Sequence, residues 1–333
     1  MMTLQKKYFK KPKLIHNLWT SYDNNTYYLT CSKGTYEVPK LDAEKFINIR
    51  PYCTGMNDIQ KISNYSGIDE KEIEKMLASL DRIGLIREEE YSEESKEVIN
   101  KKLYDACILW ASQLEHSNIF NLLVNGDLPV KVLKGVLLEN YHYIKDFPEV
   151  IKLAHLNETD GHLKALFYEY YEQEIGHEKF VLTSLKKLGL TENEVEYSIP
   201  LVSTQNIINL MSSLVSQYPI AILFISKIIE VDEYDEKAVD NFKLKISDKY
   251  KIPYKSLDAF FKHGEIDFKL GHSKLLDNNI EHINLKDEKT AGYILNALHD
   301  IKHAFDLQKL EMLDYYQTKG NYLPRQKVDF FGV

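Results

Sequence analysis

The chain has 333 residues, of which 44% are hydrophobic and 28% are charged, and these proportions are ordinary for a soluble globular protein. Its 23 tyrosines and 14 phenylalanines supply enough apolar surface for a core, which excludes a disordered or collagen-like chain. The formal net charge of −8 disfavours nucleic acid as a partner, because proteins that bind nucleic acid usually carry a positive surface.

The sequence also bears on compartment and membrane. No apolar run reaches the roughly 18 residues that a membrane-spanning helix needs, and the basic residues 1–13 lack the apolar region of a secretion signal. The three cysteines, Cys31, Cys53 and Cys107, include no CxxC pair, which favours a reducing compartment and argues against structural zinc. We therefore expect a cytoplasmic protein with no membrane partner.

The first part of the chain, up to residue 92, is built of short elements. Residues 26–31 and 34–39 are β-prone and predict a hairpin. Helical periods follow at 41–50, 57–66 and 69–83, and the segment GLIREEE at 84–90 predicts a short closing strand. A strand pair with three helices predicts a winged-helix-like α+β domain over residues 1–92.

From residue 93 to residue 333 the apolar periods are longer, and glycine and proline mark the ends of helices. The pattern predicts seven helices, at residues 93–124, 129–155, 160–188, 202–231, 234–250, 254–283 and 287–317. A chain with these helices and short connections is mainly α and forms a helical bundle.

Two acidic positions of this bundle draw attention. Glu174 and His177 are three residues apart, so on a regular helix both side chains project from one face. Such a pair is weak evidence alone, because it occurs by chance on acidic helices. Glu230 ends the largely apolar segment 218–229, and a carboxylate buried there would need a cation or a proton. The alternative is that the helix has reached solvent at Glu230.

A third position is the pair His263 and Asp267, which are four residues apart and follow two phenylalanines. This spacing again places both side chains on one helix face. Carboxylate and imidazole donors suit iron or manganese better than a thiolate set would. Together with the two earlier positions, the pair predicts a metal site inside the bundle.

The bundle resembles the heme-oxygenase-like diiron oxidases over most of residues 93–318, in the stretches GDLPVKVLKGVLLENYHYIKDFPEVI, YEQEIGHEKFVLTSLKKLGL and AFFKHGEIDFKLGHSKLL. The resemblance implies a seven-helix heme-oxygenase-like fold and a non-heme, O2-dependent iron oxidoreductase with two ferrous ions. It implies N-oxygenation of an amine, or oxidative C–C cleavage of an amino or fatty acid, in a biosynthetic pathway. The metal ligands that it implies are Glu174, His177, Glu230, His263, Asp267 and His272, with Glu174, Glu230 and His263 as the catalytic residues and Glu174 or Glu230 as the bridge.

One position departs from the family pattern. The family usually shows His-x-x-x-Asp-x-x-His, which would put the last histidine at position 270, where this chain has leucine. His272 lies nine residues after His263, about 180° around a regular helix, so it can join the site only if the helix breaks, for instance at Gly271. The alternative register, from Glu265 to His272, puts Lys269 between the ligands, where it would repel the metal. We therefore favour His263 and Asp267, and expect the second iron to bind more weakly.

The N-terminal segment resembles the small peptide-chaperone domain of pyrroloquinoline-quinone biosynthesis, in YEVPKLDAEKF and GIDEKEIEKMLASLDRIGLI. This resemblance implies a peptide or carrier partner, whereas the alternative is a domain used only for packing or dimerisation. Its last helix, 69–83, carries more acidic than basic side chains, so we expect no binding to nucleic acid. A homodimer is expected.

Two other functions remain open. The heme-oxygenase-like scaffold is shared by thiaminase-type enzymes and by a cofactorless quinone oxidase, and in that case the bundle would bind a small molecule without metal. The other is a peptide-binding module with the bundle as scaffold. The joint presence of the carboxylates and histidines favours the iron enzyme, because metal-free relatives do not need them.

Overall fold

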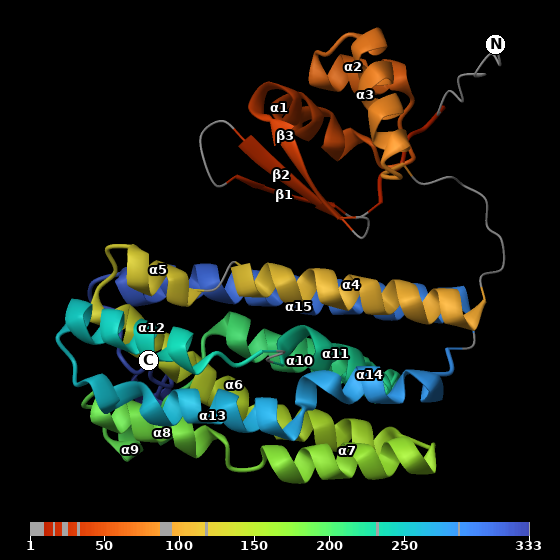
Figure 1. Cartoon of the computed structure of the whole chain (residues 1–333). Helices are drawn as coiled ribbons and strands as arrows, with labels where there is room; N and C mark the ends of the chain where they lie inside the picture. The colour runs from red at the N-terminus through yellow and green to blue at the C-terminus, as the bar shows by residue number, and fades with distance from the viewer. Residues whose placement is uncertain are drawn as a thin grey trace. The chain divides into compact units, whose positions relative to one another are not determined.

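The computed structural model describes residues 10–15, 17–21, 26–31, 34–86, 95–116, 119–230, 233–285 and 287–332. The chain divides into two compact units, residues 1–93 and 94–333 (Figure 1). The boundary predicted after residue 92 falls within residues 87–94, which lie outside the described residues.

The first unit contains a three-stranded antiparallel sheet in the order β1 (Asn17–Ser21), β2 (Thr26–Cys31) and β3 (Gly34–Pro39). Leu29 and Cys31 of β2 are buried, as the period of two in a strand requires. The hairpin of β2 and β3 occupies the predicted residues. Strand β1 was not predicted, because its five residues NLWTS show no clear alternation.

Three helices complete this unit: α1 (Lys40–Ile49), α2 (Ile59–Ser66) and α3 (Glu70–Arg82), with a short 3-10 turn η1 (Arg50–Tyr52). Asp58 and Asp69 cap α2 and α3 by accepting hydrogen bonds from backbone N–H groups. Ile86 forms a β-bridge with Leu14, whereas the rest of the predicted closing strand, 87–90, lies outside the described residues.

The second unit is helical, as predicted. Its helices are α4 (Lys96–His116), α5 (Ile119–Asn125), α6 (Val130–Asn157), α7 (Gly161–Glu174), α8 (Glu178–Lys187), α9 (Glu192–Glu196), α10 (Val202–Gln217), α11 (Ala221–Ile229), α12 (Glu236–Tyr250), α13 (Asp258–Leu270), α14 (Leu275–Asn279) and α15 (Glu288–Gln317), with 3-10 turns η2 (Tyr254–Leu257), η3 (His272–Lys274), η4 (Ile280–His282) and η5 (Phe330–Gly332). Among the described helices, none combines the length and the apolar character needed to cross a bilayer.

Three of the long predicted helices are broken, and the predictions of continuous helices there were wrong. Residues 160–188 form α7 and α8, which are separated at Gly176 with φ of 87°. Residues 202–231 are interrupted before α11 at Pro219, which lacks a backbone donor. Residues 254–283 break at Gly271, with φ of 74°. Apolar periodicity did not reveal the breaks at Gly176 and Pro219, whereas a break at Gly271 was the condition under which His272 could join the site.

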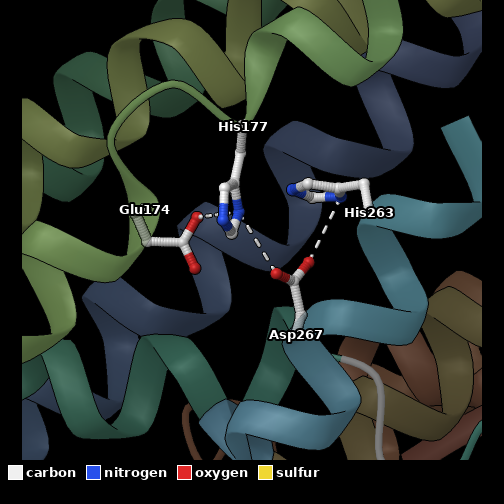
Figure 2. A group of neighbouring side chains, drawn as sticks. All are labelled: Glu174, His177, His263 and Asp267. Carbon is white, nitrogen blue, oxygen red and sulfur yellow. Dashed lines mark ion pairs between the residues drawn. The ribbon is translucent and has the colours of Figure 1, made fainter. Parts of the chain in front are cut away.

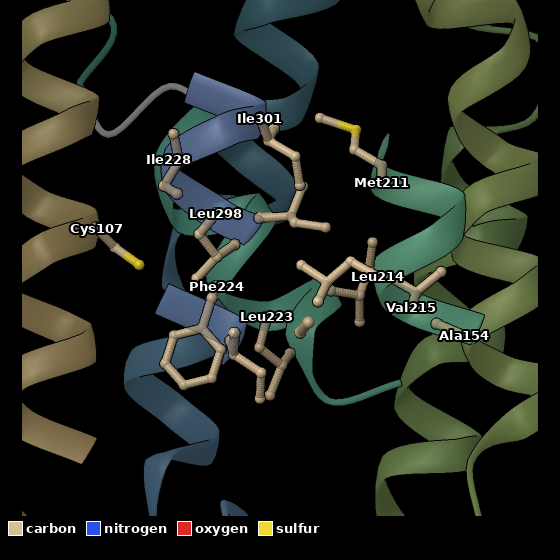
Figure 3. Close-up of a cluster of buried hydrophobic side chains, with 14 of the residues drawn as sticks. Cys107, Ala154, Met211, Leu214, Val215, Leu223, Phe224, Ile228, Leu298 and Ile301 are labelled. Carbon is tan, nitrogen blue, oxygen red and sulfur yellow. The ribbon is translucent and has the colours of Figure 1, made fainter. Parts of the chain in front are cut away.

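Helix α11 lies in the centre of the largest apolar cluster (Figure 3). Its Leu223 and Phe224 are fully buried, between α4, which carries Cys107, α10 and α15. Burying each such side chain contributes about 1.5–3 kcal/mol. Because all faces of α11 are buried, its sequence is largely apolar all round, and Glu230 follows directly as its C-cap, with its N–H donating to the carbonyl oxygen of Ser226.

A candidate dinuclear metal centre

The candidate site gathers at the ends of α7, α8, α11 and α13. Glu174 is the last residue of α7, and His177 is the N-cap of α8. The two residues therefore do not share a helix, as the sequence predicted, but the turn at Gly176 still turns both side chains to the same point (Figure 2). A Cβ at Gly176 would meet only the side chain of Lys179, at 3.6 Å, so the positive φ is what makes glycine suitable here.

The first group of donors consists of Glu174, His177, His263 and Asp267, which each offer an atom within 4.8 Å of the others. Nδ1 of His177 lies 3.5 Å from Oε2 of Glu174 and 3.3 Å from Oδ1 of Asp267. Nδ1 of His263 lies 3.2 Å from Oδ2 of Asp267. Figure 2 shows the imidazole of His177 between the two carboxylates.

The second group consists of Glu174, Glu230 and His272. Nδ1 of His272 lies 2.8 Å from Oε1 of Glu174. Glu174 thus belongs to both groups and offers one oxygen to each. The structure brings together all six residues that the sequence analysis selected, in two adjacent groups that share one carboxylate.

Several nitrogen and oxygen atoms of these groups that could bind a metal are buried and have no hydrogen-bond partner among the described residues. They are Oε1 of Glu174, Nδ1 of His177, Nε2 of His263, Oδ1 of Asp267 and Nδ1 of His272. An unsatisfied buried polar atom costs about 1–3 kcal/mol, and five in one place need a common explanation. Three carboxylates and three imidazoles form a donor set that fits iron or manganese, and cations between these atoms would satisfy them together.

The pKa values of the site reflect three carboxylates that lie close together beside histidines. Burial, together with the negative charges of Glu174 and Asp267, raises the pKa of Glu230 well above its usual range. Burial also opposes ionisation of Glu174, but the adjacent imidazoles of His177 and His272 lower its pKa to about 2. Burial disfavours the charged form of His177 as well, yet Asp267 and Glu174 raise its pKa to about 10. Positive charge is therefore strongly favoured here.

His272 reaches the site because the helix breaks before it. Helix α13 ends at Leu270, Gly271 adopts the left-handed conformation, and the turn η3 begins with His272, which is 1% exposed. This break removes the 180° offset that a continuous helix would impose. The buried Lys227 of α11 holds the turn by donating to the carbonyl oxygen of Ser273 at 3.2 Å.

The alternative register lies at the surface. Glu265 and Lys269 form an ion pair with each other, and the side chain of Lys269 is 64% exposed. Neither residue belongs to the two groups of donors. The geometry therefore favours the register of His263 and Asp267.

Two supporting residues on α7 were not selected from the sequence. The hydroxyl of Tyr170 donates to Oε1 of Glu230 at 2.5 Å, and Gln173 lies beside His272, with 2.9 Å between Oε1 and Nε2. Tyr170 precedes Glu174 by four residues and so shares its helix face, which is the signal that could have found it. Nothing comparable marks Gln173.

Glu139 and His142 have the same spacing as Glu174 and His177 but lie outside both groups. The carboxylate of Glu139 is fully buried and accepts hydrogen bonds from the hydroxyl groups of Tyr316 and Thr204. Nε2 of His142 lies 2.8 Å from Oγ of Ser198. Because these polar atoms already have protein partners, this pair has a structural role.

A cavity of about 760 Å³ reaches the site from one side. It lies between α4, α5, α6, α11 and α15, and Glu230 and Tyr143 form part of its wall. Most of the remaining wall is apolar, with Ile228, Phe305 and Met312 among its residues. The hydroxyl of Tyr143 is buried and has no hydrogen-bond partner in the described part of the chain. The volume and lining are typical of a small-molecule site.

The helical bundle is similar to known proteins in sequence and in fold. Residues 105–299 match the model of the TENA/THI-4/PQQC family. A solved domain from Shewanella denitrificans, described as having unknown function and a heme oxygenase-like fold, is 17% identical, with a TM-score of 0.53 over 71% of this chain and 100% of its own. This similarity confirms the predicted heme-oxygenase-like fold.

A TenA homologue from Pseudomonas syringae is 9% identical, with a TM-score of 0.49 over 67% of this chain and 99% of its own. No curated protein matches the chain.

Proposed function

The chain belongs to the TENA/THI-4/PQQC family, and we propose that within it this protein is a non-heme iron oxidase or oxygenase that uses two ferrous ions and dioxygen. One observation carries the proposal. Six carboxylate and imidazole side chains converge in two groups that share Glu174, and buried donor atoms in both groups have no hydrogen-bond partner among the described residues.

The donors suggest how the ions would be held. Glu174, His177, His263 and Asp267 would hold the first, and Glu174, Glu230 and His272 the second, with Glu174 as the bridge. Bound ferrous ions supply electrons for the reduction of dioxygen. Because the second group has three protein donors and the first has four, we expect the second ion to be retained less firmly.

The protein surroundings would support this chemistry in two ways. The hydrogen bond from Tyr170 fixes the carboxylate of Glu230, and Glu230 follows directly on the buried and closely packed helix α11. Burial raises the pKa of Tyr143 well above its usual range, so its hydroxyl stays protonated and can donate a hydrogen bond to a molecule in the cavity.

The substrate would occupy the cavity beside Glu230. Its apolar wall suits an aliphatic chain, and Glu115, Glu233 and Lys309 add charged groups. These features suit a small amine, amino acid or fatty acid, and the reaction would be N-oxygenation or oxidative C–C cleavage in a biosynthetic pathway.

The test is the iron content of protein prepared anaerobically with ferrous iron, followed by dioxygen uptake. We expect two irons per chain, loss of both in His263→Ala, and retention of one in His272→Ala. His303→Ala, which changes an exposed histidine, is the matched control and should keep both. Wild-type protein that binds less than one iron per chain would refute the proposal.

A second candidate is a metal-free activity on a small heterocycle. The family match favours it, since thiaminase-type enzymes and a cofactorless quinone oxidase share this scaffold, and taken alone the comparisons support it better than an iron enzyme. The cavity could hold such a ligand. Turnover or tight binding of a heterocycle that persists after exhaustive chelation would select this candidate.

A further inference from the structure

We propose that Gln173 is a positioning residue, which keeps the proton of His272 on Nε2 and so presents Nδ1 to the metal beside Glu174. This inference rests on the proposed function, because it concerns how one of the proposed ligands is prepared. Two consecutive residues, Gln173 and Glu174, contact the two nitrogen atoms of the same imidazole ring. Oε1 of Gln173 lies 2.9 Å from Nε2 of His272, and Oε1 of Glu174 lies 2.8 Å from Nδ1.

The orientation of the Gln173 amide follows from its other contact. Its Nε2 donates to Oε1 of Glu169, one helical turn earlier, at 3.4 Å. The amide oxygen therefore faces His272. A carbonyl oxygen can only accept a hydrogen bond, so Nε2 of His272 must carry a proton.

This proton determines the role of the other ring nitrogen. In a neutral imidazole with the proton on Nε2, Nδ1 has a lone pair and no proton. That lone pair faces Oε1 of Glu174, which is also an acceptor, and Nδ1 has no hydrogen-bond partner among the described residues. Two acceptors 2.8 Å apart repel each other unless a proton or a metal cation lies between them. The arrangement suits a metal ion shared by Glu174 and His272.

The position of His272 in the fold does not by itself fix the tautomer of its imidazole ring. His272 follows the break at Gly271, outside the regular helix that holds His263 and Asp267. The ring of Tyr170 contacts it edge-on, with 4.7 Å between the ring centroids, but an aromatic edge does not select a tautomer. Gln173 supplies that selection, as partners of metal-binding histidines generally do.

The test compares Gln173→Leu, which removes the acceptor, with Gln173→Glu, which retains one. Gln205→Leu, on the exposed surface of α10, is the matched control. The first measurement is ¹⁵N NMR of histidine-labelled, metal-free protein at a pH where imidazole is neutral. We expect the Nε2–H form of His272 in the wild type, Gln173→Glu and Gln205→Leu, and a mixture of both forms in Gln173→Leu.

The second measurement is calorimetric titration with Fe(II) under anaerobic conditions. Loss of a hydrogen-bond partner of a metal ligand typically weakens metal binding about 10–100-fold. We expect this loss for the second equivalent of iron in Gln173→Leu, with the first equivalent unchanged, and recovery in Gln173→Glu. The same tautomer and the same affinities in Gln173→Leu as in the wild type would overturn the inference.

The two proposals fail in different ways. If the wild type shows the Nε2–H form and Gln173→Leu loses it, but neither protein binds iron, Gln173 does keep the proton of His272 on Nε2 and the proposed iron enzyme is refuted. If the wild type binds two irons with His272 in the Nδ1–H form before loading, the proposed function stands and the role of Gln173 is refuted.

Discussion

Glu230 depends on one neighbouring hydroxyl group for its orientation. Tyr170 donates to it and is itself 2% exposed. Tyr170→Phe keeps the ring and removes the donor, so we expect about 1–2 kcal/mol lower stability and about 10–100-fold weaker binding of the second iron. Iron titration and urea unfolding measure the two effects. Tyr168→Phe, at a side chain that is 50% exposed, is the control, and equal iron affinity in both variants would contradict the prediction.

His142 should make stability depend on pH. Burial lowers its pKa to about 4, whereas the unfolded chain has the usual value of about 6.5. The folded state therefore prefers neutral His142, and stability is lost as the pH falls from about 6.5 towards 4. At pH 5 this loss is about 2 kcal/mol relative to neutral pH.

Urea unfolding at pH 7.5 and pH 5 measures this loss. His142→Gln should lose about 2 kcal/mol less than the wild type over that interval, while His303→Gln, at an exposed position, should behave as the wild type. An equal change in all three proteins would show that His142 does not set the dependence.

Much of the candidate site could be found at the scale of single residues. Glu230 stood out at the end of an apolar segment, and His263 with Asp267 stood out as a pair on one helix face, whereas their assignment to one site came from the family resemblance. Gln173 could not be found in this way, because glutamine is common on helix surfaces and its role depends on a contact with His272, 99 residues later.

At the scale of elements, the breaks at two glycines differ in how far they could be foreseen. The break at Gly271 followed from a conflict, since His272 and His263 cannot share a face of one continuous helix. The break at Gly176 left no such sign, because Glu174 and His177 would share a face on an unbroken helix too. Helical periodicity reports which residues are apolar, and it is insensitive to a single residue of positive φ.

Gly271 gives a prediction at this scale. Its φ of 74° is unfavourable for any residue with a Cβ, although a Cβ there would meet no atom within 4 Å. Gly271→Ala should therefore cost about 1–2 kcal/mol through backbone strain alone. If the chain relieves the strain by extending α13, His272 turns away and the second iron is lost.

Gly264→Ala is the matched control, because Gly264 lies inside α13 and a Cβ there also meets no atom within 4 Å. This change should stabilise the protein by about 0.5–1 kcal/mol and leave iron binding unchanged. Thermal unfolding and iron content separate the two variants. Full iron content in a destabilised Gly271→Ala protein would show that the turn tolerates alanine without moving His272.

For the whole molecule, the mainly α class could be predicted from the long apolar periods and the sparse glycine and proline, which do not depend on how the helices are arranged. The heme-oxygenase-like fold could be predicted only from the resemblance to a known family. The positions of the helix ends depended on packing. Helix α15 was predicted to within one residue at its start, since it has a cap at Asp287 and no internal break. Strand β1 is defined by its pairing with β2, which a single sequence does not reveal.

The metal centre should depend on the second unit alone. All six candidate donors and the cavity come from residues 94–333, and this unit has two apolar clusters of its own. The first unit has a separate cluster around Phe46, Ile62 and Ile73. We therefore expect a fragment of residues 95–333 to fold and to bind the same number of irons as the full chain.

Circular dichroism and iron titration of the fragment measure these two properties. A peptide or carrier partner that recognises residues 1–93 should be captured by the full chain and not by the fragment, so the same pair of proteins tests the proposed role of the first unit. A folded fragment that has lost its iron would show that the first unit contributes to the metal centre, because none of the candidate donors has been removed.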